Sequence, residues 1–379
     1  MKKRILFIHH SGGLGGAPRS LNYLLRSIER NKYVPLLINI EDGPANILFS
    51  KSRINPVLVK HCRPFHGTEG VNLTLKLIIR NWVYFIPSII NARKHIRKLQ
   101  PDLIHLNSTS LISFAIAAKL VNKKLPVICH VREVIKKGFL GWPLRFFLKR
   151  NVDGFIGIYK YGLDSLKIPR ENIKIRQEVI YNFVDVDPMK ISEQKNLYRD
   201  KLMIKKEDIV FLYLARFSAA NGWRELYDMA EVIIKEKQNY HFILAGAENI
   251  NNLKINKSTN IHILPFQNKV GQLLQTADIF VCPFTQPHFA RGIIEASAFG
   301  LPILASNIEG VNELVKQKKT GYLYDNQISF KNYAIKLGDN PKLRKELGNN
   351  GIKFAKMNFN FETNTKKTFD FYKYFENDF

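Results

Sequence analysis

Short apolar runs alternate with amphipathic stretches along the first half of the chain. The apolar runs at 4–10, 33–40, 102–107, 126–132 and 154–159 have the length and composition of buried strands. Between them, apolar residues recur at helical spacing, as in APRSLNYLLRSIER at 17–30. This alternation predicts an α/β domain with a doubly wound parallel sheet.

The same alternation starts again in the second half. Apolar runs at 209–217, 240–247, 260–266, 278–284 and 302–306 are typical of strands, and helical patterns separate most of them. Two such sets predict two Rossmann-like domains that face each other, with a ligand in the cleft beyond the carboxyl ends of the strands. We place the domains at 1–184 and 185–357, with the join inside VIYNFVDVDPMK (179–190). A further segment, 358–379, ends in a helical and aromatic pattern.

The composition excludes a disordered chain, because 45% of the 379 residues are hydrophobic and only 24% are charged. The three cysteines, Cys62, Cys129 and Cys282, lie far apart and show no metal-binding spacing, which favours a reducing cytosol. The start, MKKRILFIHHSGG, has too short an apolar run for a signal peptide. No stretch has the length of apolar sequence that a membrane-spanning helix needs.

The net charge of +26 is unevenly distributed. Residues 1–150 contain 26 Lys and Arg against 6 Asp and Glu. A basic half beside a nearly neutral half indicates an anionic partner, which leaves nucleic acid, an anionic membrane and an anionic or phosphate-linked acceptor to consider. The chain has no zinc-finger spacing, no RNA-recognition aromatic motif and no Arg-rich arm, so we do not expect nucleic acid.

Two segments combine the basic charge with large apolar residues. NLTLKLIIRNWVYFIPSIINARKHIRKL (72–99) and GFLGWPLRFFLKR (138–150) mix Lys and Arg with Trp, Phe, Leu and Ile. Such segments suit the interface between water and anionic lipid. They are equally consistent with ordinary helices that pack an apolar face on the core and expose a basic face.

Glycines follow the first predicted strand. In HHSGGLGGAPRS, Gly12, Gly13, Gly15 and Gly16 stand between a strand and a helix, where a backbone can approach a phosphate at the helix N-terminus. The stretch is not a P-loop, because no Gly-Lys-Ser/Thr follows, and it lacks the spacing of the dinucleotide fingerprint. A plain structural turn is the alternative. His9 and His10 precede it, and such a pair commonly has one packed and one solvated member.

Other polar residues end strands of the first half. Asn107 and Ser108 follow the strand at 102–107, where they either line the acceptor side of the cleft or cap the next helix. Asn182 and Asp185 fit a turn between the domains, and we interpret both as structural.

Two charged residues stand out in the second half of the chain, one carboxylate and one cation. In TQPHFARGIIEASAFGLPIL (285–304), Glu295 is predicted to lie in the first turns of a helix that follows a short loop. A carboxylate there can serve the helix dipole, or it can bind a ligand that the preceding loop approaches. In YLARFSAANGWRELYDMAEVI, Arg216 is predicted just past the end of a strand, where a guanidinium can pair with a diphosphate or lie on the surface.

Together these motifs resemble the retaining nucleotide-sugar glycosyltransferases of family 4 (group 1), which have the GT-B fold. The resemblance covers nearly the whole chain through GGAPRSL, HVRE, YNFVDVDPM, LARFSAANGW and, most specifically, ADIFVCPF, HFARGIIEASAFGLPILASNIEGVNELV and GYLY. It implies two Rossmann-like domains across a cleft and a C-terminal helix that crosses back to the first domain. The first domain would bind the acceptor and the second the nucleotide sugar.

The resemblance also implies roles for particular residues. Glu295 would bind the ribose hydroxyls, Arg216 the diphosphate, and His130 in PVICHVRE would lie near the sugar and the reacting centre, although a core histidine is the alternative. The neighbours of His130, Arg132 and Glu133, would pair with each other or serve the site. The implied ligands of the nucleotide sugar are Gly15, Gly16, Arg216, Asn221, His288, Phe289, Ala290, Arg291, Gly292 and Glu295.

Two positions depart from the family pattern. The family has two glutamates eight positions apart, and Pro287 stands at the first of these, between Gln286 and His288, either of which is a candidate replacement donor. Asn221 stands where the family has a lysine near the diphosphate, and Arg224 or Arg291 would have to compensate.

The expected function is a cytosolic, bacterial-type, retaining glycosyltransferase that moves a sugar from a nucleotide diphosphate, preferably UDP, to a glycan or lipid-linked acceptor of a surface polysaccharide. We expect no cofactor and no metal, since no Asp-x-Asp site stands out at a strand end. Arg216, the 289–292 backbone and the Gly15–Gly16 turn would stabilise the departing diphosphate. A GT-B epimerase of nucleotide sugars, a non-catalytic nucleotide- or glycan-binding member and a polyanion-binding protein remain the alternatives.

Overall fold

The computed structural model describes residues 2–169, 174–184, 197–250, 253, 255, 258–267 and 270–375. The chain divides into two compact units, each described by itself below. Unit 1 comprises Met1–Asn182 and Glu362–Phe379, and unit 2 comprises Phe183–Phe361. The limits proposed from the sequence were 184/185 and 357/358, and Asp185 lies outside the described residues.

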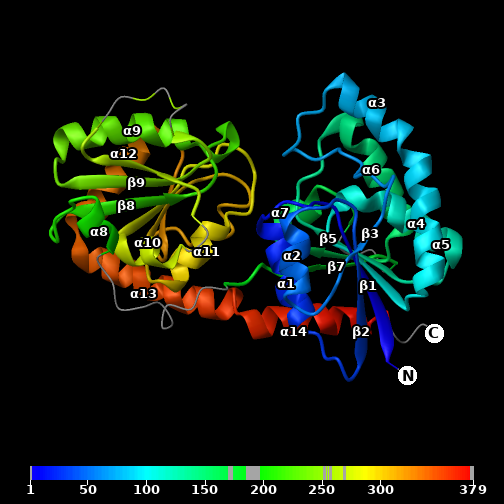
Figure 1. Cartoon of the computed structure of the whole chain (residues 1–379). Coiled ribbons are helices and arrows are strands. Elements are labelled where there is room, and N and C mark those ends of the chain that lie inside the picture. Colours follow the sequence, from blue (N-terminus) through cyan, green and yellow to red (C-terminus); the bar gives the residue numbers. More distant parts are fainter. Residues whose placement is uncertain are drawn as a thin grey trace. The chain divides into compact units, whose positions relative to one another are not determined.

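Unit 1 alternates strands and helices from its first residues, as the apolar pattern predicts (Figure 1). Its elements are β1 (Lys3–His9), α1 (Gly16–Arg26), β2 (Tyr33–Asn39), α2 (Pro44–Ser50), β3 (Val57–Leu58), α3 (Leu75–Val83), α4 (Phe85–Leu99), β4 (Leu103–Leu106), η1 (Thr109–Leu111), α5 (Ile112–Val121), β5 (Val127–Val131), α6 (Gly138–Asn151), β6 (Gly154–Gly157), α7 (Lys160–Asp164), β7 (Arg176–Val179) and, after unit 2, α14 (Phe361–Lys373).

In the described part of unit 1, all seven strands pair in parallel, in the order β3-β2-β1-β4-β5-β6-β7. The chain builds outward from β1 to β3 and then returns to add β4 on the other side of β1. The strand order therefore reverses between β1 and β4, which is where ligands bind in open parallel sheets. The short strands β3 and β7 escaped the sequence analysis, because two residues or the polar run RQEV give no apolar signal.

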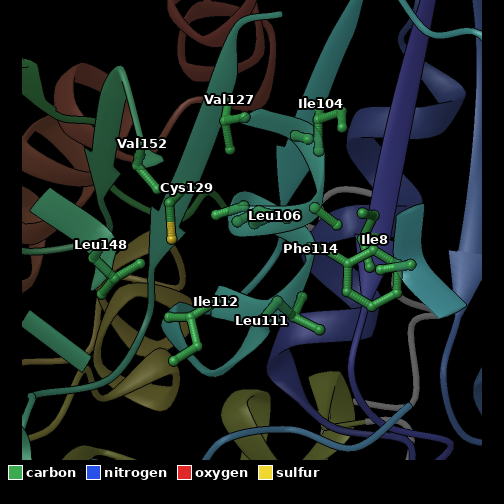
Figure 2. Close-up of a cluster of buried hydrophobic side chains, with 14 of the residues drawn as sticks. Ile8, Ile104, Leu106, Leu111, Ile112, Phe114, Val127, Cys129, Leu148 and Val152 are labelled. Atoms are coloured by element: carbon green, nitrogen blue, oxygen red, sulfur yellow. The ribbon is translucent and has the colours of Figure 1, made fainter. Parts of the chain in front are cut away.

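Both faces of this sheet are covered, as a parallel sheet requires. Successive residues of β1 point to opposite sides: Leu6 and Ile8 join the core formed with α4, α5 and α6, while Ile5 and Phe7 pack with α1, α2 and α14. Figure 2 shows the first of these clusters, in which side chains of β1, β4 and β5 meet those of α5 and α6. The last helix contributes Phe369, Phe371 and Tyr372 to the second cluster.

Unit 2 repeats the architecture, with six strands among its described residues. Its elements are α8 (Leu197–Lys201), β8 (Ile209–Leu214), η3 (Ala219–Asn221), α9 (Trp223–Glu236), β9 (Tyr240–Ala247), β10 (Ile261–Pro265), α10 (Gly271–Thr276), β11 (Ile279–Cys282), α11 (Arg291–Ala298), β12 (Ile303–Ser306), β13 (Gly321–Tyr324), α12 (Gln327–Asp339) and α13 (Pro341–Asn358).

The strand order of unit 2 is β10-β9-β8-β11-β12-β13, again with every pairing parallel. The order reverses between β8 and β11, so the loops that follow these two strands begin side by side at one edge of the sheet. A core of large aromatic residues lies under this edge, where Phe211 and Tyr213 of β8 pack with α9 and α12. The structure thus confirms the predicted fold class of two doubly wound parallel sheets.

Candidate functional site

The two loops at the reversal point of unit 2 are in direct contact. The backbone N–H of Thr285 donates to the carbonyl of Ala220 at 3.0 Å, and the Thr285 hydroxyl donates to the carbonyl of Ala219 at 2.8 Å. Gly222 has φ +65°, and a side chain there would collide with the carbonyl of Pro283. The loop 215–222 and the loop 283–290 are therefore held together, which brings the segments of Arg216 and Glu295 to one place.

Arg216 lies exposed just past the end of β8. Its carbonyl accepts hydrogen bonds from the hydroxyl of Tyr213 at 3.0 Å and from the side-chain amide of Asn221 at 2.9 Å. Asn221, the residue at the family lysine position, thus fixes the backbone of the loop that carries the arginine. The guanidinium is left at the surface of this edge, where it can meet an anion.

Arg291 and Glu295 form an ion pair one turn apart on α11. Arg291 Nε lies 2.9 Å from Glu295 Oε1, and the side chains are 18% and 10% exposed. Glu295 is the fifth residue of this eight-residue helix, which agrees with the prediction that it lies in the first turns, whereas the alternative of a first-turn acid that serves the dipole is wrong. Arg291 is likewise no simple surface charge, because it pairs with the carboxylate predicted to bind the ribose.

The other residues predicted in this loop divide between packing and exposure. Phe289 and Ala290 are buried, and Ala290 is the N-cap of α11 without a capping side chain. A side chain at Gly292 would approach the Phe280 ring to 2.6 Å, so this glycine lets α11 pack on the sheet. His288 is exposed, with its ring 5.7 Å from that of Phe284.

The second proposed compensating cation, Arg224, lies on α9. Its Nε is 3.5 Å from Asp228 Oδ1, and both side chains are about half exposed. Its guanidinium carbon also lies within 6 Å of the ring centres of Trp223 and Tyr227. Arg224 therefore has partners along its own helix, and Arg291 is the cation that the structure brings into the loop beside Glu295.

The glycine turn of unit 1 contains glycines with different roles. A side chain at Gly12 would overlap the carbonyl of Asp42, and one at Gly43 would lie 2.6 Å from the carbonyl of Gly12. Gly12 therefore serves the contact between two loops. A side chain at Gly16 would meet nothing within 4 Å. Gly15 is the N-cap of α1 and has no side chain to cap it, so the first amides of α1 point past these two glycines.

A buried polar network lies at the reversal point of unit 1, between β1 and β4. The side-chain amide of Asn107 donates to His9 Nδ1 at 2.9 Å, and Asn107 Oδ1 accepts from Arg132 Nη2 at 2.7 Å and from Arg132 Nε at 3.0 Å. Because His9 Nδ1 accepts, its ring proton lies on Nε2. Burial, with His10 and Arg132 nearby, lowers the pKa of His9 well below the usual imidazole value.

The contacts next to this network show which of Asn107 and Ser108 caps a helix, and whether Arg132 and Glu133 pair with each other. Ser108 caps the short helix η1 by accepting from the Ser110 N–H, whereas Asn107 serves the network rather than a cap. Arg132 also reaches Asn182 Oδ1 at 3.4 Å, while Glu133 accepts from the Ser108 hydroxyl at 3.2 Å. Arg132 and Glu133 therefore bond different side chains, and burial raises the pKa of Glu133.

His130 lies in a buried row that ends on the last helix. His130 Nδ1 is 3.3 Å from His105 Nε2, and His105 Nδ1 is 2.7 Å from the hydroxyl of Tyr372 on α14. Burial, reinforced by Arg132, lowers the pKa of both histidines, that of His105 to about 3. Nδ1 of His130 thus faces another buried side chain, His105. The contact of His130 with a sugar stays a prediction.

Sequence reasoning missed several of these residues. Tyr213, which holds the Arg216 loop, is the single hydroxyl-bearing residue in the apolar strand IVFLYL, and Tyr372 lies in the aromatic C-terminal segment. Both stand out only as polar groups in apolar surroundings, and their partners are 3 and 267 positions away.

The described residues contain neither a candidate metal cluster nor a candidate membrane-spanning helix. No cluster of three or more His, Cys, Asp or Glu side chains in this part of the chain is arranged to hold a metal ion. Among its helices, none combines the length and the hydropathy that crossing a membrane would take.

Two family models match the chain. That of the glycosyl transferases group 1 matches residues 194–354, and that of Glycosyltransferase Family 4 matches residues 14–188. Together they cover the described parts of both units apart from the ends.

Curated relatives and solved structures are similar over much of the chain. The UDP-Gal:alpha-D-GlcNAc-diphosphoundecaprenol alpha-1,3-galactosyltransferase of Escherichia coli is 26% identical over 286 residues, which make up 68% of this chain and 71% of that protein. The N,N'-diacetylbacillosaminyl-diphospho-undecaprenol alpha-1,3-N-acetylgalactosaminyltransferase of Campylobacter jejuni is 30% identical over 199 residues, or 50% of this chain and 52% of that protein. The crystal structure of Anabaena HepE in complex with UDP superimposes with a TM-score of 0.78 at 20% identity and covers 98% of this chain and all of that chain, which shows the GT-B fold.

Proposed function

Because the chain belongs to the group 1, family 4 glycosyltransferases, we propose that it transfers a sugar from a nucleotide diphosphate, preferably UDP, with retention of anomeric configuration. The observation that carries this proposal is the contact between the loops 215–222 and 283–290 at the reversal point of unit 2. An exposed arginine lies on the first loop, and the second loop leads directly into α11, which has an uncapped start and carries an arginine–glutamate pair.

These groups have complementary tasks toward a nucleotide sugar. Arg216 and the amides at the start of α11 would bind the diphosphate, because a guanidinium and a helix N-terminus both favour an anion. Glu295 would accept hydrogen bonds from the ribose hydroxyls, with Arg291 holding one of its two oxygens in place. Gln286 and His288 are exposed side-chain donors on either side of Pro287, the position where the family has its first glutamate.

The proposed reaction breaks the bond between the anomeric carbon and the diphosphate oxygen. The acceptor oxygen forms the new bond on the same face, and its proton leaves with the diphosphate. Catalysis then consists of positioning the two substrates and stabilising the charge that develops on the leaving group, for which Arg216 is the main residue of this chain. We propose that no metal ion takes part.

Unit 1 is assigned to the acceptor. The two relatives described above are named for acceptors linked through a diphosphate to undecaprenol. The excess of Lys and Arg in residues 1–150 suits a diphosphate-bearing or otherwise anionic acceptor. We propose a lipid-linked or glycan acceptor in surface polysaccharide synthesis, His130 near the reacting centre, the Gly15–Gly16 turn near the phosphates, and a cytoplasmic location at the inner face of the membrane.

A panel of nucleotide sugars tests the proposal. Thermal stabilisation by UDP, GDP and ADP would identify the base, and release or transfer of sugar from the matching donors would identify the reaction. The anomeric configuration of the product, followed by proton NMR, tests retention, and the same assay with a chelator tests the absence of a metal. If no nucleotide stabilises the protein and no donor is consumed, the proposal fails.

A further inference from the structure

The helix α3 turns its apolar face outward. Leu75, Ile79, Trp82 and Val83 follow the spacing i, i+4, i+7 and i+8, which places them on one face of the helix, and all four are exposed. Leu75 is 74% and Val83 61% exposed. Water is a poor solvent for such a face, so an apolar or interfacial environment would stabilise it.

The opposite face of α3 is held to unit 1 by a polar contact. Asn81 is buried, its side-chain oxygen accepts from the His66 N–H at 3.0 Å, and its amide donates to the His66 carbonyl at 2.8 Å. A helix that only packed on the core would bury its apolar face and expose its polar face. The reading of segment 72–99 as an ordinary core-facing helix therefore fails for α3, although α4 does bury apolar residues.

The start of α6 exposes a second set of large apolar side chains. Phe139 is 82% and Trp142 57% exposed, and they lie three residues apart on one face of the helix. Trp142 stacks on Phe146 with ring centres 4.9 Å apart, and the guanidinium carbon of Arg150 lies 4.2 Å from the centre of the Phe146 ring. The Arg150 guanidinium thus lies next to the aromatic pair of Trp142 and Phe146.

A continuous row of rings connects the two helices. Trp82 contacts Phe85, Phe85 contacts Phe147, Phe147 contacts Phe146, and Phe146 contacts Trp142, with ring centres 4.9 to 5.7 Å apart. The segments that lead into the helices are also tied, because Thr68 and Ile135 form an antiparallel bridge. We call the exposed set the apolar surface: Leu75, Ile79, Trp82, Val83, Phe139 and Trp142. Figure 1 shows α3 and α6 in the same region of unit 1.

The charge around this surface is mostly positive, although Glu69 Oε2 lies 3.7 Å from Lys136 Nζ. Residues 70–101 contain six Lys and Arg, residues 134–152 contain five, and neither segment contains any Asp or Glu. Lys76 and Arg80 on α3, and Lys137 and Lys149 at the ends of α6, are exposed. Large apolar side chains among an excess of cations suit the boundary between headgroups and acyl chains of a bilayer that contains anionic lipid.

We propose that unit 1 docks on an anionic bilayer through the apolar surface, with α3 lying in the plane of the interface. The side chains of the surface enter the acyl boundary, and Lys76, Arg80, Lys137 and Lys149 reach the lipid phosphates. The inference deepens the proposed location at the inner face of the membrane, but it does not depend on sugar transfer, since it concerns helices remote in sequence from the loops of the donor site. Unit 1, which we assign to the acceptor, would then lie at the bilayer that carries a lipid-linked acceptor.

Other partners fit the surface less well. A nucleic acid would use the cations but would leave an outward face of Leu, Ile and Val without a partner. A protein partner would have to be strongly acidic around an apolar centre. Only a bilayer with anionic lipid supplies both components over a wide and deformable surface.

Vesicle sedimentation tests the proposal without donor or acceptor. We expect the wild-type protein to bind vesicles of one part phosphatidylglycerol to two parts phosphatidylcholine at low salt, and to bind pure phosphatidylcholine much less. The double variants Leu75→Ser/Ile79→Ser and Phe139→Ser/Trp142→Ser should each lower the partition coefficient by about tenfold or more. Lys76→Glu/Arg80→Glu should lower it by a similar factor, because each cation near the surface is worth roughly a fivefold change.

Matched controls separate docking from loss of fold. Ile328 and Met357 of unit 2 are 74% and 75% exposed, so Ile328→Ser/Met357→Ser removes equivalent apolar groups and should bind like wild type. In a Trp223→Phe background the remaining tryptophans are Trp82 and Trp142, whose fluorescence should be quenched by lipids with brominated acyl chains.

Several results would overturn the proposal. These are no sedimentation of the wild-type protein at low salt, a loss of binding in the charge variant but not in the apolar variants, an unquenched Trp82 and Trp142, or tighter binding of duplex DNA through the same residues. Sugar transfer to a detergent-solubilised acceptor is measured in parallel. A protein that transfers sugar but ignores vesicles refutes docking alone, and one that binds vesicles but consumes no donor refutes the proposed function alone.

Discussion

Arg291 Nε donates to Glu295 Oε1 across one turn of α11, at 2.9 Å and with both side chains largely buried. The carboxylate assigned to the ribose is therefore oriented by its own helix before any ligand arrives. A preoriented acceptor loses less side-chain entropy when a ligand binds, which favours affinity.

The first prediction concerns this carboxylate. Glu295→Gln should weaken UDP binding by about tenfold or more, because hydrogen bonds to a charged group contribute roughly 1.5–3 kcal/mol. Arg291→Leu should weaken it less, and the double variant should show coupling of about 0.5–3 kcal/mol between the two sites. Titration calorimetry measures both quantities.

The substrate itself supplies the control for the ribose contact. The wild-type protein should prefer UDP to 2′-deoxy-UDP, and Glu295→Gln should lose much of that preference. Lys235→Ala, at an exposed position of α9, should bind both like wild type. An unchanged preference in Glu295→Gln would remove the ribose role.

The second prediction concerns the diphosphate. Arg216→Ala should weaken UDP binding by about tenfold or more, from the roughly 1.5–3 kcal/mol of a charge-assisted hydrogen bond. Uridine carries no phosphate, so its binding should change little, and the comparison of the two ligands isolates the contact. Asn221→Ala should have a smaller effect on UDP, because Asn221 bonds the Arg216 carbonyl and acts through the loop. Equal losses for uridine and UDP in Arg216→Ala would contradict the assignment.

The third prediction separates two glycines of one turn. Gly12→Ala should lower the melting temperature, since its methyl group would overlap the Asp42 carbonyl. Gly16→Ala should leave the melting temperature unchanged or raise it, because the methyl group meets nothing within 4 Å and alanine favours a helix by about 0.5–1 kcal/mol over glycine. If this turn approaches a substrate, Gly16→Ala should still reduce turnover. Normal turnover in Gly16→Ala would limit the turn to a structural role.

The fourth prediction is a loss of stability in mild acid. Burial lowers the pKa of His10 to about 4 and that of His105 to about 3, from an ordinary value of 6.5. Unfolding below pH 6.5 therefore takes up protons. The free energy of unfolding should be constant with respect to these histidines above pH 6.5 and should fall as the pH drops toward their pKa values in the folded state. Each such histidine should contribute a slope of about 1.4 kcal/mol per pH unit within this window.

Urea unfolding followed by circular dichroism at several pH values measures this slope. His105→Gln keeps a hydrogen-bonding side chain that does not titrate, so it should reduce the slope by the share of one histidine, whatever it does to stability at neutral pH. A stability that does not change between neutral pH and about pH 5 would show that these histidines are not held neutral in the folded state.

Much of the fold follows from local pattern. The apolar runs at 4–10 and 209–217 became β1 and β8, because a strand buried on both faces needs a continuous apolar run. The reversal points between β1 and β4 and between β8 and β11 follow from the order in which such strands are wound. Arg216 could be selected from the sequence because it lies just after a strand, and Glu295 because it lies within a long specific motif.

Other features depend on contacts between residues that are distant in sequence or separated by a helical turn. The pairing of Arg291 with Glu295, the hold of Asn221 on the Arg216 carbonyl, and the reach of Tyr372 to His105 could not be read from the sequence, because each depends on the direction of a side chain in the packed unit. The same holds for α3. Its amphipathic pattern was visible in the sequence, but the pattern alone does not say which face of the helix is buried. Only the packed structure, in which Asn81 is buried, shows that the apolar face is turned to the solvent.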